Sequence, residues 1–194
     1  MRILAAATEV FRERGVEAPL DLVAQRANVG RGTLYRHFPN RAALVAALME
    51  RRLTALEAFA AGHPSEDVLE HLLVEICELQ LRIPGLVPVV RAAGSSEVLD
   101  DVLARTREMF TRALEQAHAA HAVRQDITVD DVYLAAAMLN GVVEAGRDGT
   151  PPAYERALAL VLRSLRSERR LTLPVPLPQI DRTMEAALGA SARR

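Results

Sequence analysis

A chain of 194 residues, half of them hydrophobic, is long enough to bury a core without disulfides or metal ions, and this composition argues against disorder over most of its length. The single cysteine, Cys77, excludes a disulfide framework and fits a reducing compartment. No apolar run approaches the roughly 18 residues that would suggest a membrane span, and the opening residues lack the cleavage site of a signal peptide. We therefore expect a cytoplasmic protein with no membrane partner.

The net charge of −1 hides an uneven distribution along the chain. Residues 1–52 hold nine Arg and five Asp or Glu, a net charge of +4, whereas residues 53–194 carry a net charge of −5. A basic end on an acidic body is typical of a protein that meets phosphate with one end.

Helical periodicity starts with the first residues. The first helix has one apolar stripe and a glycine, Gly15, where a helix commonly ends; the stripe consists of Ile3, Leu4, Ala7, Val10 and Phe11. A second, shorter helix is predicted around Leu20 to Ala27, and Asn28, which tolerates a left-handed backbone, can form the corner before a third helix. A fourth helix is predicted from about Arg41 to Ala61, with Asn40 as its cap.

The rest of the chain also follows a helical pattern. Amphipathic helices are predicted after Ser65, after Ser95 or Ser96, from Thr128 to about Gly146, and over 154–165, with a short, bent element around 87–93. No stretch alternates like a strand, so we predict an all-α fold. Prolines 174, 176 and 178 favour an extended tail over 171–194, either loosely ordered or docked on the body, which can include one more short helix.

The segment VGRGTLYRHFPNR, residues 29–41, places many hydrogen-bond donors on one short helix. Two short helices joined by a tight turn describe a helix-turn-helix, whose second helix enters the major groove of DNA. Arg31 can fork onto guanine, Thr33 can contact a phosphate or a thymine methyl group, and Gly32 lets the backbone approach closely. The predicted DNA-binding residues are Arg31, Gly32, Thr33, Tyr35, Arg36, His37 and Arg41. On spacing alone, a polar helix on a solvated face remains the alternative.

Residues 3–48 closely resemble the N-terminal DNA-binding domain of TetR/AcrR-family transcriptional regulators. The resemblance lies in a helix ending in "F.ERG", then "A..A.V..GTLY.HF", then "..R.AL". It implies that Arg31, Gly32, Thr33, Tyr35 and His37 face the operator and that Arg41 binds phosphate. The chain departs from the family where Ala18-Pro19-Leu20 offers no hydroxyl at the start of the second helix, and where Asn28 and Gly30 replace a common Gly and Ser.

The resemblance also implies a homodimer, because the last two large helices of family members typically form a four-helix bundle between subunits. Here these would be residues 129–145 and 153–166. Small residues at 135–137, 141 and 146 would allow close approach, although they could instead pack within their own subunit. The expected domains are a helix-turn-helix domain over 1–46, a helical effector-binding and dimerisation domain over 47–170, and the tail over 171–194.

A small-molecule effector is expected to bind among the middle helices, and the candidate residues are semi-polar or aromatic side chains on otherwise apolar faces. These are Cys77, Gln80, Arg91, Thr106, Phe110, Tyr133 and Met138. With aromatic residues at 4% and no Trp, a mostly aliphatic pocket for an apolar or amphipathic effector is a better prediction than an aromatic box.

An enzyme is the remaining class to consider. Glu115, His118 and His121 are spaced as on one helix face, but a di-iron bundle needs a second Glu-x-x-His motif, and Glu70-His71 is adjacent instead of spaced. We therefore predict no catalytic residues, no metal and no cofactor. The sequence predicts a ligand-responsive repressor that binds a near-palindromic operator as a homodimer; the alternative is a helical dimer that binds a small molecule or a partner protein without reading DNA.

Overall fold

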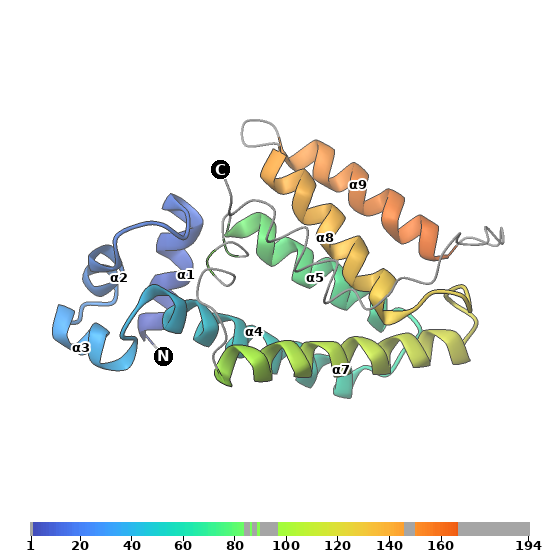
Figure 1. The fold of residues 1–194 in the computed structure, drawn as a ribbon, viewed down its shortest axis with the longest axis horizontal. Helices are drawn as coiled ribbons and strands as arrows, with labels where there is room; N and C mark the ends of the chain where they lie inside the picture. Colours follow the sequence, from blue (N-terminus) through green and yellow to red (C-terminus); the bar gives the residue numbers. More distant parts are fainter. Residues whose placement is uncertain (1, 84–85, 87–88, 90–96, 146–149, 167–194) are drawn as a thin grey trace. The chain divides into compact units, whose positions relative to one another are not determined.

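The computed structural model describes residues 2–83, 86, 89, 97–145 and 150–166, and every regular element within these ranges is a helix (Figure 1), which confirms the all-α prediction. The helices are α1 (Arg2–Arg14), α2 (Leu20–Arg26), α3 (Arg31–His37), α4 (Arg41–Gly62), α5 (Val68–Arg82), α7 (Glu97–Ala119), α8 (Val129–Ala145) and α9 (Thr150–Leu165). Within the described ranges, none of the helices combines the length and the hydrophobicity that spanning a bilayer requires. The predicted tail over 171–194 and the start of a helix at Ser95 or Ser96 lie outside them.

Contacts divide the chain into two compact units. The first unit comprises residues 1–63 and 76–109, and the second comprises residues 64–75 and the residues from 110 onward. The chain passes from one unit to the other three times: just after α4, within α5 and within α7.

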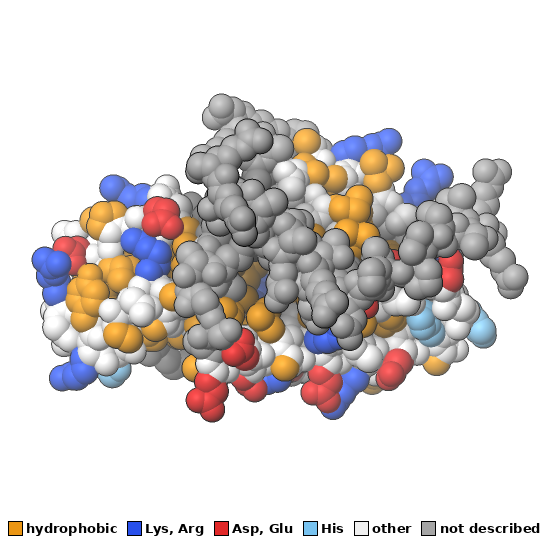
Figure 2. All heavy atoms as spheres, viewed as in Figure 1, with side chains coloured by type: hydrophobic (Ala, Val, Ile, Leu, Met, Phe, Trp, Pro, Cys, Tyr) orange, Lys and Arg blue, Asp and Glu red, His pale blue; other side chains and the backbone are white. Residues whose placement is uncertain are grey.

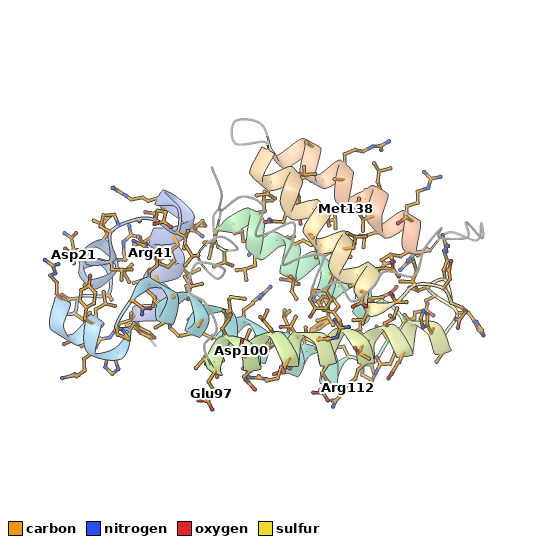
Figure 3. The ribbon with its side chains drawn as sticks, viewed as in Figure 1. Asp21, Arg41, Glu97, Asp100, Arg112 and Met138 are labelled. Atoms are coloured by element: carbon orange, nitrogen blue, oxygen red, sulfur yellow. The ribbon has the colours of Figure 1, made fainter. Side chains whose placement is uncertain are left out.

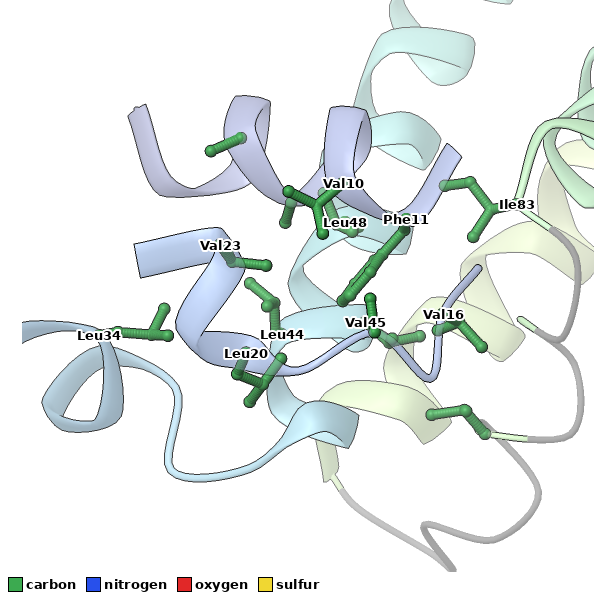
Figure 4. Packing of buried hydrophobic residues seen from close by; sticks show 14 of the residues in the cluster. Val10, Phe11, Val16, Leu20, Val23, Leu34, Leu44, Val45, Leu48 and Ile83 are labelled. Atoms are coloured by element: carbon green, nitrogen blue, oxygen red, sulfur yellow. The ribbon is translucent and has the colours of Figure 1, made fainter. Parts of the chain in front are cut away.

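The first unit is built around the fully buried ring of Phe11 on α1 (Figure 4). Helices α2, α3 and α4 each contribute aliphatic side chains to the same cluster, as do Ile83, Leu86 and Val89. The members labelled in Figure 4 are Val10, Phe11, Val16, Leu20, Val23, Leu34, Leu44, Val45, Leu48 and Ile83. Fully burying one such side chain contributes about 1.5–3 kcal/mol. The core under α1–α3 is therefore completed by the first half of α4.

Local sequence signals set where these helices begin and end. Gly15 has a φ of 76° and Asn28 a φ of 53°, so both adopt the left-handed backbone that the sequence predicts for them. The side chain of Asn40 accepts a hydrogen bond from the amide of Ala43 at 2.8 Å, which confirms it as the cap of α4. These three residues set the corners between α1, α2, α3 and α4.

The second unit contains α8 and α9, which pack side by side (Figure 1). The amide of Arg124, in the loop before α8, donates to the carbonyl of Leu165 at the end of α9 at 3.2 Å. Thr128 caps α8 as predicted: its hydroxyl accepts from the amide of Asp131, and the Asp131 carboxylate accepts from the amide of Thr128 at 2.8 Å. Arg166 forms ion pairs with Asp67 and Glu70, which join the residue after α9 to the start of α5.

Candidate nucleic-acid interface

Helix α3 is attached to its unit by one side and exposed on the other. Leu34 is fully buried in the core cluster, and Phe38, which follows the helix, packs partly buried against the same cluster. The rest of the helix is available at the surface: Arg31, Gly32, Tyr35, Arg36 and His37 are exposed and Thr33 is half-buried. The predicted reading residues therefore lie together on a short helix that its apolar side holds in place.

The turn before α3 has the geometry of a helix end closed by a left-handed residue. The amide of Asn28 donates to the carbonyl of Gln25 and the amide of Val29 to that of Ala24, both at 3.0 Å, which is the hydrogen-bond pair of a Schellman motif. Gly30, the residue just before α3, provides no side-chain cap, as expected where the family often has Ser. The rigid corner at Asn28 fixes the direction in which α3 leaves α2.

Arg31, the first residue of α3, is paired across the turn with Asp21 of α2. The Arg31 Nε atom lies 2.9 Å from Asp21 Oδ1, and the Arg31 side chain remains 71% exposed. Asp21 lies in the first turn of α2, where a carboxylate is favoured by the helix dipole. Asp21 is not among the predicted DNA-binding residues, because a contact between residues ten apart depends on the angle between the two helices.

Arg41, expected to contact phosphate, has a set of contacts within the protein (Figure 3). Its guanidinium donates to the carbonyl of Val16, to that of Ala18 at 2.8 Å and to that of Glu17 at 3.2 Å, and its side chain is only 24% exposed. This set of bonds joins the start of α4 to the α1–α2 loop. A phosphate contact by Arg41 stays a prediction, and the structure adds a structural role that spacing could not show.

A second ion-pair cluster lies between α1 and α2. Arg26 bridges Glu9 and Glu13, with nitrogen–oxygen distances of 2.9 Å to each. The hydrogen bond from Arg26 holds the pKa of the Glu13 carboxyl below its ordinary value. A shallow hollow of about 450 Å³ next to this cluster is lined by Val10, Glu13, Arg14, Leu22, Gln25 and Arg26, none of which was predicted to bind an effector.

The candidate effector residues fall in different surroundings. Cys77 is fully buried on α5, and the Thr106 hydroxyl donates to the carbonyl of Val102 at 2.7 Å within α7. The rings of Phe110 and Tyr133 meet edge to face with centroids 6.0 Å apart. Met138 is 60% exposed on α8. The Gln80 side chain and Arg91 lie outside the described residues.

The Glu115–His118–His121 pattern does not continue along one helix, which corrects the sequence-based expectation. Helix α7 ends at Ala119, and His121 adopts a φ of 57° and closes it, with the amide of Ala122 donating to the carbonyl of Ala117 at 2.9 Å. The His118 ring makes a 3.0 Å hydrogen bond with the Arg124 carbonyl. Within the part of the chain that the structure describes, no group of His, Cys, Asp and Glu side chains could hold a metal ion.

An all-helical chain whose N-terminal helices form a helix-turn-helix with donors on the second helix defines a class of DNA-binding regulators. The family model described as bacterial regulatory proteins of the tetR family matches residues 3–48. The TetR transcriptional regulator SCO0520 from Streptomyces coelicolor, whose structure is solved, is 31% identical in sequence to this chain. The match covers 87% of this chain and 98% of the SCO0520 chain, and the two structures superpose with a TM-score of 0.63. The chain belongs to the TetR family of transcriptional regulators.

The sequence matches to curated relatives cover a smaller part of the chain than the match to SCO0520 does. The HTH-type transcriptional repressor KstR of Rhodococcus jostii is 30% identical over 58% of this chain and 58% of its own. The HTH-type transcriptional repressor Rv3405c of Mycobacterium tuberculosis is 29% identical over 60% of this chain and 65% of its own. The chain thus spans less than two thirds of the length of these curated relatives.

Proposed function

We propose that this protein is a sequence-specific DNA-binding transcriptional regulator, a repressor that binds a near-palindromic operator as a homodimer. The observation that carries the proposal is α3 itself: Leu34 fixes the helix to the core while Arg31, Tyr35 and His37 remain at the surface. Membership of the TetR family and the repressor names of the relatives support this function. It accounts for the basic N-terminal quarter of an otherwise acidic chain.

On DNA, α3 would lie in the major groove with its first residues toward the bases. Arg31 would fork onto a guanine, and the helix start at Gly30 and Gly32 leaves no side chain to hold the backbone away. Tyr35, Arg36 and His37 would contact the phosphate backbone and set the register. In a two-fold dimer the two reading helices would then be ~34–36 Å apart or a multiple of that distance.

The outer face of α8 and α9 supports the homodimer. Met138 on α8 is 60% exposed and Leu160 on α9 is 53% exposed, and Gly141 on α8 and Ala153 on α9 are also exposed. Hydrophobic side chains come to the surface over α8 and α9 in Figure 2, and Figure 3 labels Met138 among them. Ala135 and Leu139 are buried instead, so α8 has an inner and an outer face, and the outer one fits a second copy of the chain.

The dimer is tested by placing a charge on that outer face. Met138→Glu should convert the protein to a monomer at low micromolar concentration, as measured by light scattering after size exclusion. Leu103→Glu on α7, which also puts a carboxylate at an exposed apolar position, serves as the matched control and should stay dimeric. A dimer that survives Met138→Glu would exclude this face as the interface.

The effector and the cellular setting follow from the same proposal. An apolar or amphipathic small molecule would release the operator by binding better to the arrangement of the two reading helices that does not fit DNA. Phe110 and Tyr133, which are in contact, are the first of the candidate residues to change in ligand-binding experiments. The proposal includes a cytoplasmic, non-enzymatic protein that uses no cofactor.

Selection of binding sequences from random DNA duplexes tests DNA reading directly, with wild type and Arg31→Ala at two salt concentrations. We expect a palindromic consensus that loses its preference at one base pair per half-site in Arg31→Ala. Arg12→Ala on α1 removes the same charge from the same unit and should leave the consensus unchanged. Binding that selects no sequence and fades as salt rises would show phosphate attraction alone. It would favour the alternative, a helical dimer that binds a small molecule or a partner protein.

A further inference from the structure

We propose that Asp21 is a positioning residue for base recognition, which holds Arg31 in the orientation that reads the operator. The proposal rests on the proposed function, since it concerns how one of the reading side chains is prepared before DNA arrives. Asp21 belongs to α2 and Arg31 to α3, so the contact spans the two helices of the helix-turn-helix.

The contact engages one edge of the guanidinium. The closest atoms are Arg31 Nε and Asp21 Oδ1, at 2.9 Å, and the Arg31 side chain is still 71% exposed. An arginine presents five N–H donors in a planar fork, and guanine recognition uses two of them on the O6 and N7 acceptors. A carboxylate on the Nε side therefore leaves the terminal nitrogens for the base.

The helices that carry Asp21 and Arg31 are both anchored in the core beside these two residues. Leu20, next to Asp21, is buried in the core cluster, and Leu34, one turn after Arg31, is fully buried in the same cluster (Figure 4). The turn between the helices is closed by the left-handed Asn28. Because both helices are anchored in the core on either side of the contact, the ion pair acts on the Arg31 side chain itself, and a restricted side chain loses less freedom when it binds.

The negative charge of Asp21 makes its expected effect distinctive. A carboxylate beside the reading helix weakens the attraction to every phosphate, so a general role in affinity would favour its absence. A positioning role predicts opposite effects on two quantities: removing the charge should strengthen binding to all DNA, and should weaken the preference for the base pair that Arg31 reads. A purely structural role in α2 would leave the ratio of the affinities for two DNA sequences unchanged.

The experiment compares dissociation constants for two duplexes: the one selected by wild type, and the same duplex with the base pair most sensitive to Arg31→Ala exchanged. A good arginine–guanine fork gives roughly 5- to 150-fold discrimination. We expect Asp21→Asn to lower that discrimination about 1.5- to 5-fold, the range for an exposed ion pair. Glu17→Gln is the matched control, because it also removes one exposed carboxylate from the same unit. The Glu17 side chain is 80% exposed, and its Oε2 atom lies 3.7 Å from Nε of Arg41, so it pairs with a different arginine.

A second measurement follows the pairing without DNA. In a spectrum of arginine Nε–H groups, Asp21→Asn should shift the Arg31 signal and Glu17→Gln should not. In an Arg31→Ala background, Asp21→Asn should no longer change the discrimination between the two duplexes. Equal changes in discrimination for Asp21→Asn and Glu17→Gln, an increase on Asp21→Asn, or an unmoved Arg31 signal would each overturn the proposal. If wild type itself shows no preference between sequences, the proposed function fails first, and the Arg31 signal then shows whether the pair exists without a reading role.

Discussion

Replacing Arg41 can distinguish a contribution to folding stability from a contribution to DNA binding, because its guanidinium already makes hydrogen bonds within the protein when no DNA is bound. Arg41 donates to the carbonyls of Val16, Glu17 and Ala18, and Val16 and Ala18 are buried residues. A hydrogen bond to a charged group contributes about 1.5–3 kcal/mol, and water can replace part of the set at a side chain that is 24% exposed. We therefore expect Arg41→Ala to lower the free energy of unfolding by about 2–4 kcal/mol, the value of one to two such bonds.

Urea unfolding followed by circular dichroism measures this loss, with all variants at one protein concentration because the stability of any self-associating protein depends on it. Arg41→Lys keeps the charge, but a single ammonium cannot reach three carbonyls as a planar fork does, so we expect about half the loss. Glu17→Gln removes only the exposed carboxylate 3.7 Å from Arg41 and should cost at most about 1 kcal/mol. If Arg41→Ala weakens DNA binding while its urea midpoint equals that of wild type, Arg41 acts through phosphate alone and the reasoning is refuted.

Three further predictions concern the same unit. Leu34→Ala removes a fully buried side chain and should cost about 3–5 kcal/mol in urea unfolding; a loss below about 1 kcal/mol would mean that α3 is not anchored through this residue. Gly15→Ala should lower the free energy of unfolding by about 1–2 kcal/mol, because φ is 76° at this position, although a Cβ there would meet no atom within 4 Å. Gly62→Ala, at an equally open position at the end of α4, should leave the free energy of unfolding unchanged. Equal effects of the two substitutions would contradict the strain argument. The third prediction concerns pH. Because Arg26 lowers the pKa of Glu13 in the folded protein, the stability difference between wild type and Arg26→Ala should be fully present above the ordinary Glu pKa of 4.5 and should shrink as the pH falls through the lowered value. Thermal unfolding across this range measures it, and a difference that stays constant into strong acid would contradict the linkage.

The features that the sequence predicts correctly are those encoded locally. The apolar stripe around Phe11, the left-handed corner at Asn28 and the cap at Asn40 each depend on residues within one or two turns, and all three are confirmed. The grouping of the exposed donors of α3 also follows from a period of 3.6 residues, since burying Leu34 leaves its neighbours outside.

The features that the sequence could not predict depend on how helices meet. The pairing of Asp21 with Arg31 and the bonds of Arg41 to the α1–α2 loop require the directions of α2, α3 and α4, which no spacing reveals. The outward position of Met138 could not be predicted, because α8 carries apolar or small residues on most of its circumference and its exposed face therefore does not stand out in the sequence. His121 ends a run rich in alanine without the glycine or proline that would have signalled the end of α7.

The buried thiol of Cys77 allows local opening around α5 to be measured by chemical modification. Cys77 is the only cysteine in the chain, and its side chain is fully buried on α5. A reagent that modifies thiols can reach it only when that part of the helix separates from its neighbours. The modification rate, divided by the rate for a small free thiol, gives the population of the opened form. The protein therefore reports without any label how operator DNA or a candidate effector changes the frequency of that opening.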